Sequence, residues 1–199
     1  MKIISGLYKG KEIKGYDIIG TRPTMNRVKE SLFAMIQNYT QDSIVLDLFS
    51  GTGNYGIEAL SNGSKYVYFN DLNPKCTKII KDNLDNCKIT SNYEIFNLDY
   101  NKCLDYLKNN NIKLDLIFLD PPYKEDIING IINKIEEYNI LNDKGLIICE
   151  LTNNNLLDNY SNLSIYKTRK YGDKEIIIYK KSLWKKRKKV YYFLFFWYN

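Results

Sequence analysis

The sequence contains no histidine, and it has few arginines, alanines and cysteines. With histidine absent, every mechanism that needs an imidazole base, nucleophile partner or metal ligand is excluded. No C-x-x-C pair occurs, which argues against a zinc cluster and against a secreted disulfide framework. The cysteines are Cys76, Cys87, Cys103 and Cys149. We therefore expect no metal site.

Long apolar runs are also missing. No stretch approaches the roughly 18 apolar residues that a membrane-spanning helix needs. The amino-terminal residues reach Gly6 before an apolar run can build, so we expect no secretory signal peptide. These features predict a cytoplasmic protein without a membrane partner.

Arginine is rare although basic residues are common. Arginine accounts for 4 of the 29 basic residues, and lysine supplies the rest. Lysine is a poor substitute where a phosphate is recognised by a planar, bidentate group. Arg22 and Arg27, close together in the sequence, are therefore candidate phosphate contacts.

Charge is distributed unevenly along the 199 residues. Residues 1–40 carry 7 basic and 3 acidic residues, residues 41–179 carry 15 and 20, and residues 180–199 carry 7 and none. A basic beginning and a basic end on an acidic middle favour contact between the chain ends and a polyanion. We expect this polyanion to be a nucleic acid.

The pattern of apolar residues predicts an α/β fold. Residues 2–14 favour a short hairpin, and a helix is expected over about 25–38. From residue 43 onward, short apolar strands alternate with helices, which indicates a parallel Rossmann-like sheet with helices on both faces. The expected strands cover 43–49, 66–69, 93–97, 114–119 and 145–150. A β-hairpin is expected over 163–170 and 175–181.

Three segments follow from these patterns. Residues 1–40 form an amino-terminal hairpin and helix, residues 41–181 form the α/β domain, and residues 182–199 form a basic and aromatic tail. Nine apolar residues at the end of the tail are too few to cross a bilayer. We expect the tail to be disordered, with docking on RNA or on a membrane surface as alternatives.

A glycine-rich turn follows the first strand of the domain. Asp47 lies at the strand end, and Gly51, Gly53 and Gly56 give the spacing G-x-G-x-x-G. A carboxylate here repels a pyrophosphate but accepts a hydrogen bond from an ammonium group. The turn therefore favours a ligand with an amino-acid end, such as S-adenosylmethionine.

Two further acidic residues follow the next strands. Asp71 ends the second strand, where an acid can accept both ribose hydroxyls of a nucleoside. Asp99 follows the third strand and is a candidate contact for the adenine amino group.

The fourth strand ends in Asp120-Pro121-Pro122-Tyr123. The prolines lack backbone donors, so the Asp120 carboxylate and nearby carbonyls remain as a group of acceptors. Acceptors suit an exocyclic amine, and Tyr123 offers a face on which a planar base can stack. The four residues are thus a candidate site for methyl transfer to a nucleobase amine.

Taken in order, these segments resemble a known family. The runs LDLFSGTGNYGIEAL, NDLNPK and FLDPPY resemble class I methyltransferases that act on nucleobase amines, and the opening IISGLYKGKEIKG with TRPTMNRVKESLF is similar to the bacterial 16S rRNA guanine-N2 methyltransferase family RsmD. The resemblance covers about residues 1–180. It implies a seven-stranded sheet, S-adenosylmethionine as methyl donor, and small-subunit rRNA within an assembling particle as substrate. We expect the protein to be a monomer.

The resemblance also implies residue roles. Asp47, Gly51 and Gly53 match the donor loop, and Asp71 matches the ribose-binding acid. The run Asp120 to Tyr123 matches the target-amine motif, and Arg22 with Arg27 match the basic segment near RNA. Asn54 and Tyr55 stand where small residues are common in the family, so we expect them to crowd the loop.

Three alternatives remain open at this point. The same acceptor chemistry serves adenine-N6 methylation of DNA, although the chain has little room for a target-recognition region. A non-catalytic RNA-binding assembly factor would also carry basic ends. Methylation of a small molecule is disfavoured by those ends.

Overall fold

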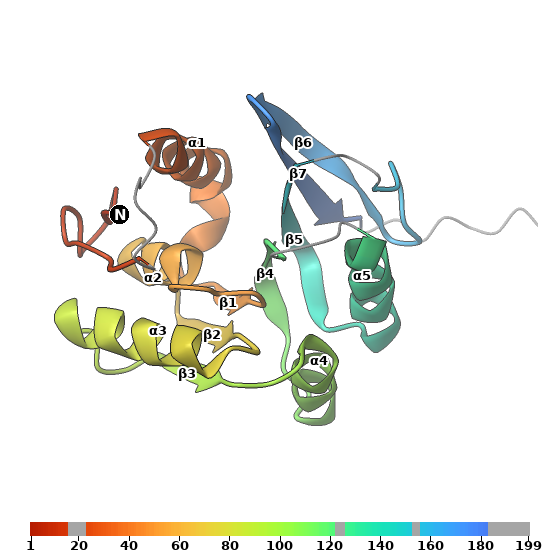
Figure 1. Ribbon diagram of the computed structural model, residues 1–199. Coiled ribbons are helices and arrows are strands. Elements are labelled where there is room, and N and C mark those ends of the chain that lie inside the picture. Colours follow the sequence, from red (N-terminus) through yellow and green to blue (C-terminus); the bar gives the residue numbers. More distant parts are fainter. Residues whose placement is uncertain (16–22, 122–125, 153–155, 183–199) are drawn as a thin grey trace, which may run out of the picture.

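The computed structural model describes residues 1–15, 23–121, 126–152 and 156–182. Helices and strands alternate through most of this length (Figure 1). The helices are α1 (Pro23–Thr40), α2 (Asn54–Ser61), α3 (Pro74–Asn86), α4 (Tyr100–Asn109) and α5 (Asp126–Tyr138). The strands are β1 (Ile44–Asp47), β2 (Tyr66–Asn70), β3 (Tyr93–Phe96), β4 (Leu114–Leu119), β5 (Leu141–Leu151), β6 (Leu163–Tyr171) and β7 (Lys174–Lys181).

One sheet of 7 strands organises the fold, in the order β3-β2-β1-β4-β5-β7-β6. Strands β1 to β5 are parallel, and β7 runs antiparallel to both β5 and β6. The order reverses between β1 and β4, and in open α/β sheets ligands bind beyond the carboxyl ends of the strands at such a point. The expected Rossmann-like fold class is confirmed.

Helices cover both faces of the sheet (Figure 1). One core joins α1, α2 and α3 to side chains such as Phe118 and Ile148, and the other joins α4 and α5 to side chains such as Ile117 and Cys149. Successive strand residues point to opposite faces, which explains why these strands are apolar without interruption. Side chains two positions after Phe118 or Ile148 point to the same face of the sheet, and they therefore also face α1 and α2.

Most expected elements lie within a few residues of the observed ones. Asn73 caps α3 by accepting a hydrogen bond from the Lys75 backbone N–H at 3.0 Å, and Pro74 is the first residue of the helix. Strand β5 begins at Leu141, four residues before the expected start. There Lys144 adopts a φ of 66°, and the pairing with β4 shifts register between Leu114 and Leu116. Because the pairing is irregular here, the segment around Lys144, whose sequence is typical of a turn, remains part of β5.

The amino-terminal residues form the expected hairpin and pack on the domain. Lys2 and Glu12 form an antiparallel bridge, and Glu58 of α2 accepts hydrogen bonds from the backbone N–H groups of Ile4 and Ser5 at 2.9–3.0 Å. Lys29 of α1 lies 2.8 Å from Glu58, and both side chains are almost completely buried. This ion pair joins the hairpin, α1 and α2.

Among the described residues, no helix is both long enough and apolar enough to cross a bilayer. The tail at 183–199 lies outside the described residues.

Candidate active site at the carboxyl edge of the sheet

Three of the expected acidic residues meet at one edge of the sheet. Asp47 of β1 is in register with Phe69 of β2 on one side and with Phe118 of β4 on the other. Asp71 and Asp120 each follow these partners by two residues. The structure therefore brings Asp47, Asp71 and Asp120 together at the carboxyl ends of adjacent strands, at the point where the strand order reverses.

The glycine loop after β1 closes on itself. The Gly53 N–H donates to the Ser50 carbonyl at 2.7 Å, and Gly51 and Gly53 have φ values of 55° and 80°, in the left-handed region that favours glycine. A side chain at Gly53 would meet Ile57 at 3.1 Å, whereas one at Gly51 would point into open space. The backbone at Gly51 is thus open to a ligand.

Asp47 is a buried carboxyl group with spare acceptor capacity. Its Oδ2 accepts a hydrogen bond from the Gly56 N–H at 2.9 Å, and no hydrogen bond from the described residues reaches its Oδ1. Burial raises the pKa of Asp47 to about 7, and the charge of Asp71 adds to this against the opposing Gly56 hydrogen bond. A cationic ligand would compensate this buried charge.

Asp71 connects the end of β2 to the glycine loop. Its Oδ2 accepts a hydrogen bond from the Gly51 N–H at 2.9 Å, and its Oδ1 accepts one from the Asn73 N–H at 2.8 Å. Each carboxylate oxygen can accept a further bond. Asp71 is half-buried, so its remaining lone pairs are within reach of a ligand at Gly51.

Asp99 has a local structural role. It precedes α4, and its side chain accepts a hydrogen bond from the Asn101 N–H at 2.9 Å, which caps the helix. Since β3 ends at Phe96, Asp99 stands three residues beyond the strand. Its contact with an adenine amino group stays a prediction.

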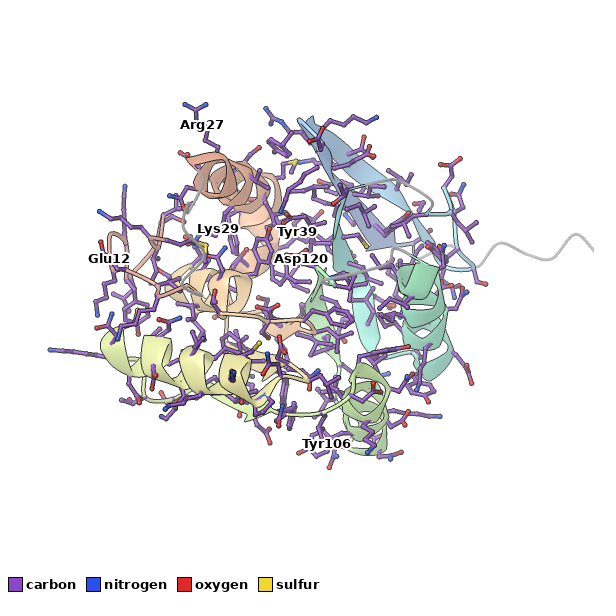
Figure 2. The ribbon with its side chains drawn as sticks, in the orientation of Figure 1. Glu12, Arg27, Lys29, Tyr39, Tyr106 and Asp120 are labelled. Carbon is purple, nitrogen blue, oxygen red and sulfur yellow. The ribbon has the colours of Figure 1, made fainter. Side chains whose placement is uncertain are left out.

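Asp120 presents a carboxylate to solvent near the centre of the molecule (Figure 2). No hydrogen bond from the described residues reaches this carboxylate. Desolvation by the surrounding protein nevertheless raises the pKa of Asp120 to about 7, with Glu150 and Asp47 raising it further and Lys174 opposing them.

The rest of the target-amine motif is described only in part. Pro121 is half-buried, whereas Pro122 and Tyr123 lie outside the described residues. Of the two candidate phosphate contacts, Arg22 also lies outside them. Arg27 is exposed on α1 and points away from the body of the protein (Figure 2).

Tyr55 and Glu150 lie beside Asp120, and sequence reasoning missed Glu150. Glu150 of β5 is only 8% exposed, and Tyr55 of α2 donates a hydrogen bond to it. Tyr55 also stacks on Phe118, with ring centroids 5.3 Å apart and planes 9° apart. The Tyr55 side chain, which we expected to crowd the glycine loop, therefore extends across β4 toward β5.

Asn70, which the sequence did not single out either, holds the loops of this edge in place. Its Nδ2 donates to the carbonyls of Leu48 and Leu98, both at 3.1 Å. These carbonyls belong to the segments after β1 and β3. One buried amide thus fixes the two loops on either side of β2.

The arrangement fits a nucleoside donor with an amino-acid end. Asp47 offers a buried acceptor for an ammonium group, Asp71 offers a carboxylate for hydroxyls, and the backbone at Gly51 leaves space between them. Groups of histidine, cysteine or carboxylate side chains that could hold a metal ion are absent from the described part of the chain.

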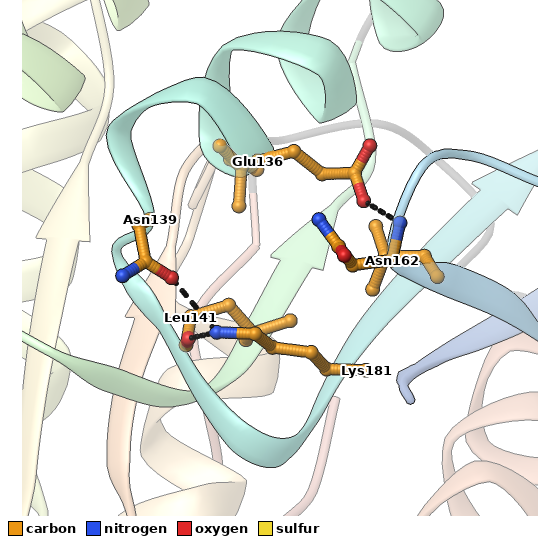
Figure 3. A pocket seen from close by; sticks show the side chains of 7 residues that line it. Glu136, Asn139, Leu141, Asn162 and Lys181 are labelled. Atoms are coloured by element: carbon orange, nitrogen blue, oxygen red, sulfur yellow. Dashed lines mark hydrogen bonds between the residues drawn. The ribbon is translucent and has the colours of Figure 1, made fainter. Parts of the chain in front are cut away.

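A small pocket lies at the other end of β5, between α5 and the β6–β7 hairpin (Figure 3). Its polar groups already pair with one another. Lys181 donates to the Asn139 side chain at 2.9 Å and to the Leu141 carbonyl at 2.7 Å, and Glu136 accepts from the backbone N–H groups of Ser161 and Asn162. We assign no ligand to it.

Comparison with known proteins identifies the family of this chain. Residues 1–180 match the family described as "Conserved hypothetical protein 95". The chain is 36% identical to "Putative rRNA methyltransferase YlbH" of Bacillus subtilis over 91% of this chain and 99% of that protein. It is 34% identical to ribosomal RNA small subunit methyltransferase D of Haemophilus influenzae over 86% of this chain and 89% of that protein.

Solved structures show the same architecture. The structure of "Putative methyltransferase yhhF from Escherichia coli" is similar with a TM-score of 0.79 at 25% identity, over 92% of this chain and 98% of that one. The expected methyltransferase fold of the sheet is thereby confirmed.

Proposed function

Because the chain belongs to the RsmD family of S-adenosylmethionine-dependent methyltransferases, we propose that it methylates the exocyclic N2 amine of a guanine in small-subunit rRNA. The rRNA substrate is suggested by the names of the relatives, and the amine by the chemistry of Asp120. S-adenosylmethionine supplies an electrophilic methyl group when bound beside the glycine loop. The chain's own residues have to hold the amine in line with it.

The observation that carries this proposal is the carboxylate of Asp120. It follows β4, adjacent to the Asp47 strand, and it accepts no hydrogen bond from the described residues. An amine presents N–H donors, so this free acceptor can orient it with its lone pair directed at the methyl group. The same site would then hold donor and target on neighbouring strands.

In the reaction, the amine nitrogen forms a bond to the methyl carbon while the carbon–sulfur bond breaks and its electron pair stays on sulfur. The nitrogen becomes positively charged and then loses a proton. Asp120 stabilises the developing charge as a carboxylate, and it can take up the proton and pass it to solvent, to which it is exposed. No histidine is needed for this step.

The base must leave its stack to reach this edge. We propose that Tyr123 stacks on the extruded guanine and that the backbone carbonyls at Pro121 and Pro122 add acceptors beside Asp120. Asp47, Gly51, Gly53 and Asp71 would hold the donor, with Asp99 near its adenine.

The RNA is proposed to lie across the edge between α1 and the β6–β7 turn. Residues 1–40 would supply Arg22 and Arg27. On the other side, β7 pairs antiparallel with β5 so that Leu151 faces Glu175, which puts the β6–β7 turn beyond the carboxyl end of β5. Figure 1 shows this turn and α1 on the same side of the molecule. Arg169 and Lys170 are exposed just before the turn.

The biological setting follows from the proposed substrate. Small-subunit rRNA is assembled in the bacterial cytoplasm, so we propose that the protein acts there as a monomer on assembling particles, with residues 41–181 as the methyltransferase domain.

The test is methyl transfer from labelled S-adenosylmethionine to small ribosomal subunits that lack the modification. Digestion of the rRNA then identifies the product nucleoside. We expect N2-methylguanosine, formed by the wild-type protein and strongly reduced with Asp120→Ala.

Other products would redirect the proposal. N6-methyl-2′-deoxyadenosine, formed when DNA replaces the subunits as substrate, would favour the adenine methyltransferase alternative. If no nucleic acid is methylated while Asp120→Ala rescues particle assembly as well as wild type does, the protein is an assembly factor without catalysis.

A further inference from the structure

A second carboxylate lies next to Asp120. Leu119 of β4 is in register with Cys149 of β5, so the next residues, Asp120 and Glu150, end up side by side on parallel strands. Two positions before these acids, Phe118 of β4 and Ile148 of β5 pack in the same core as α1 and α2. The two acids therefore share one face of the sheet.

Glu150 is held in place by two different elements. Tyr55 of α2 donates to its Oε2, and Lys174, the first residue of β7, pairs with its Oε1. Burial raises the pKa of Tyr55 well above its ordinary value, and the charges of Glu150 and Asp120 raise it further, so Tyr55 stays a hydrogen-bond donor. With both oxygens engaged, the Glu150 carboxylate is held in one position beside Asp120.

We propose that Glu150 is a positioning residue which, together with Lys174 and Tyr55, controls when Asp120 carries a negative charge at the target amine. The inference rests on the proposed function, in which Asp120 acts as a carboxylate. Glu150 opposes ionisation of Asp120, and Lys174 favours it. The balance between them decides how readily Asp120 accepts a proton from the methylated amine.

Among the described residues, the charged and titratable groups around Asp120 come from four elements. They are Asp47 on β1, Glu150 on β5, Lys174 on β7 and the phenol of Tyr55 on α2. Because Glu150 and Lys174 act in opposite directions, removing each should move the titration of Asp120 in opposite directions. A role confined to folding would not produce paired shifts of opposite sign.

The experiment measures two quantities in each variant. One is the pKa of Asp120 in the free protein, by NMR of labelled carboxyl groups. The other is the pH profile of methyl transfer to small subunits in a single turnover. In the pH profile of methyl transfer, the acid limb should move to lower pH with Glu150→Gln, because a negative charge is lost. It should move to higher pH with Lys174→Met, because a positive charge is lost, and each shift should be about one pH unit.

Matched variants isolate the effect. Lys174→Arg keeps the positive charge, so its acid limb should lie at the same pH as that of the wild type. Lys65→Met removes an exposed lysine at the amino end of β2, away from the proposed RNA surface, and should leave both quantities unchanged. Lys65 is exposed, Lys174 is partly exposed, and Glu150→Gln keeps the size of the side chain, so folded protein is expected in each case.

The possible outcomes separate the two claims. Opposite shifts in both quantities support the inference. If wild-type protein methylates guanine while the Asp120 pKa stays fixed or moves the same way in both variants, the inference is wrong and the proposed function stands. If the NMR shifts are opposite but no nucleic acid is methylated, the charge coupling stands and the function, with the role of Glu150 in it, is wrong.

Discussion

The Asp71 carboxylate accepts a hydrogen bond from the backbone N–H of Gly51 at 2.9 Å. This contact joins the residue after β2 to the turn after β1, 20 positions earlier in the chain. The acid proposed to bind the donor ribose therefore also shapes the glycine loop on which the donor would lie. Removing it should disturb both.

We predict that Asp71→Ala weakens binding of S-adenosylmethionine by about 1–3 kcal/mol, since buried hydroxyls lose a charged acceptor and the loop loses its tether. Titration calorimetry measures the affinity. Asp82→Ala, on the exposed surface of α3, is the control and should bind normally. Unchanged affinity in Asp71→Ala would remove this residue from the donor site.

Stability should depend strongly on the buried pair of Lys29 and Glu58. Burial lowers the pKa of Lys29, and the neighbouring Glu58 opposes this, as expected for a cation held inside the protein by its partner. Lys29→Met leaves Glu58 without its cation and should reduce the free energy of unfolding by about 3 kcal/mol. Urea denaturation measures this change.

The control is an ion pair at the surface. Lys81 and Asp85 lie 3.0 Å apart on α3 with more than half of each side chain exposed. Lys81→Met should leave the unfolding free energy close to that of the wild type, because water screens such pairs. Equal effects of the two substitutions would contradict the structural importance of the buried pair.

Binding of the donor should release protons near neutral pH. The pKa of Asp47 is raised to about 7 by burial, so at pH 7 about half of the free protein carries a protonated Asp47. An ammonium group beside it favours the ionised form and expels this proton. Affinity should therefore weaken as the pH falls below 7.

Calorimetry in buffers of different ionisation enthalpy measures the released protons. S-adenosylhomocysteine is the suitable ligand, because it has the ammonium group without the sulfonium charge that would also act on Asp120. Asp47→Asn should abolish the buffer dependence, and Asp120→Asn should keep it. If the wild type shows no proton release, Asp47 does not receive the ammonium group.

RNA binding should depend on the exposed arginine of α1. Arg27→Ala should weaken binding to small-subunit rRNA and reduce the salt slope by about one counterion, as for a single phosphate contact. Donor affinity should not change. Lys65→Ala, at the amino end of β2 on the opposite edge, should leave both quantities as in the wild type. Equal salt slopes for the two variants would refute the RNA surface.

The sequence predicts the strand ends well because each apolar run stops at a polar residue. Asp47, Asp71 and Asp120 could be placed at one edge for that reason, since parallel strands bring their carboxyl ends together. Asp99 lies between a strand and a helix, where an acid fits a ligand contact, a helix cap or both. The Asn101 hydrogen bond shows the cap, which the sequence did not predict, and the ligand contact stays a prediction.

Contacts between distant side chains could not be predicted. Tyr55 and Glu150 are 95 positions apart, and Lys29 and Glu58 belong to different helices. A glutamate inside an apolar strand and a lysine on the apolar side of a helix mark sites that need partners, because buried charges are rarely left unpaired. The sequence does not say which residues those partners are.

Asp120 is proposed to act on the target amine in the transition state. The most direct test is a single-turnover measurement, with wild-type or Asp120→Ala protein saturated with labelled donor and mixed with small subunits that lack the modification. We predict normal affinity for donor and particle and a methyl-transfer rate reduced by about 100-fold or more, because the lost contact strengthens chiefly as the nitrogen becomes charged. Asp120→Asn, which keeps an acceptor oxygen without the charge, should fall between the two. A rate close to wild type in Asp120→Ala, or a loss explained entirely by weaker binding, would contradict the account.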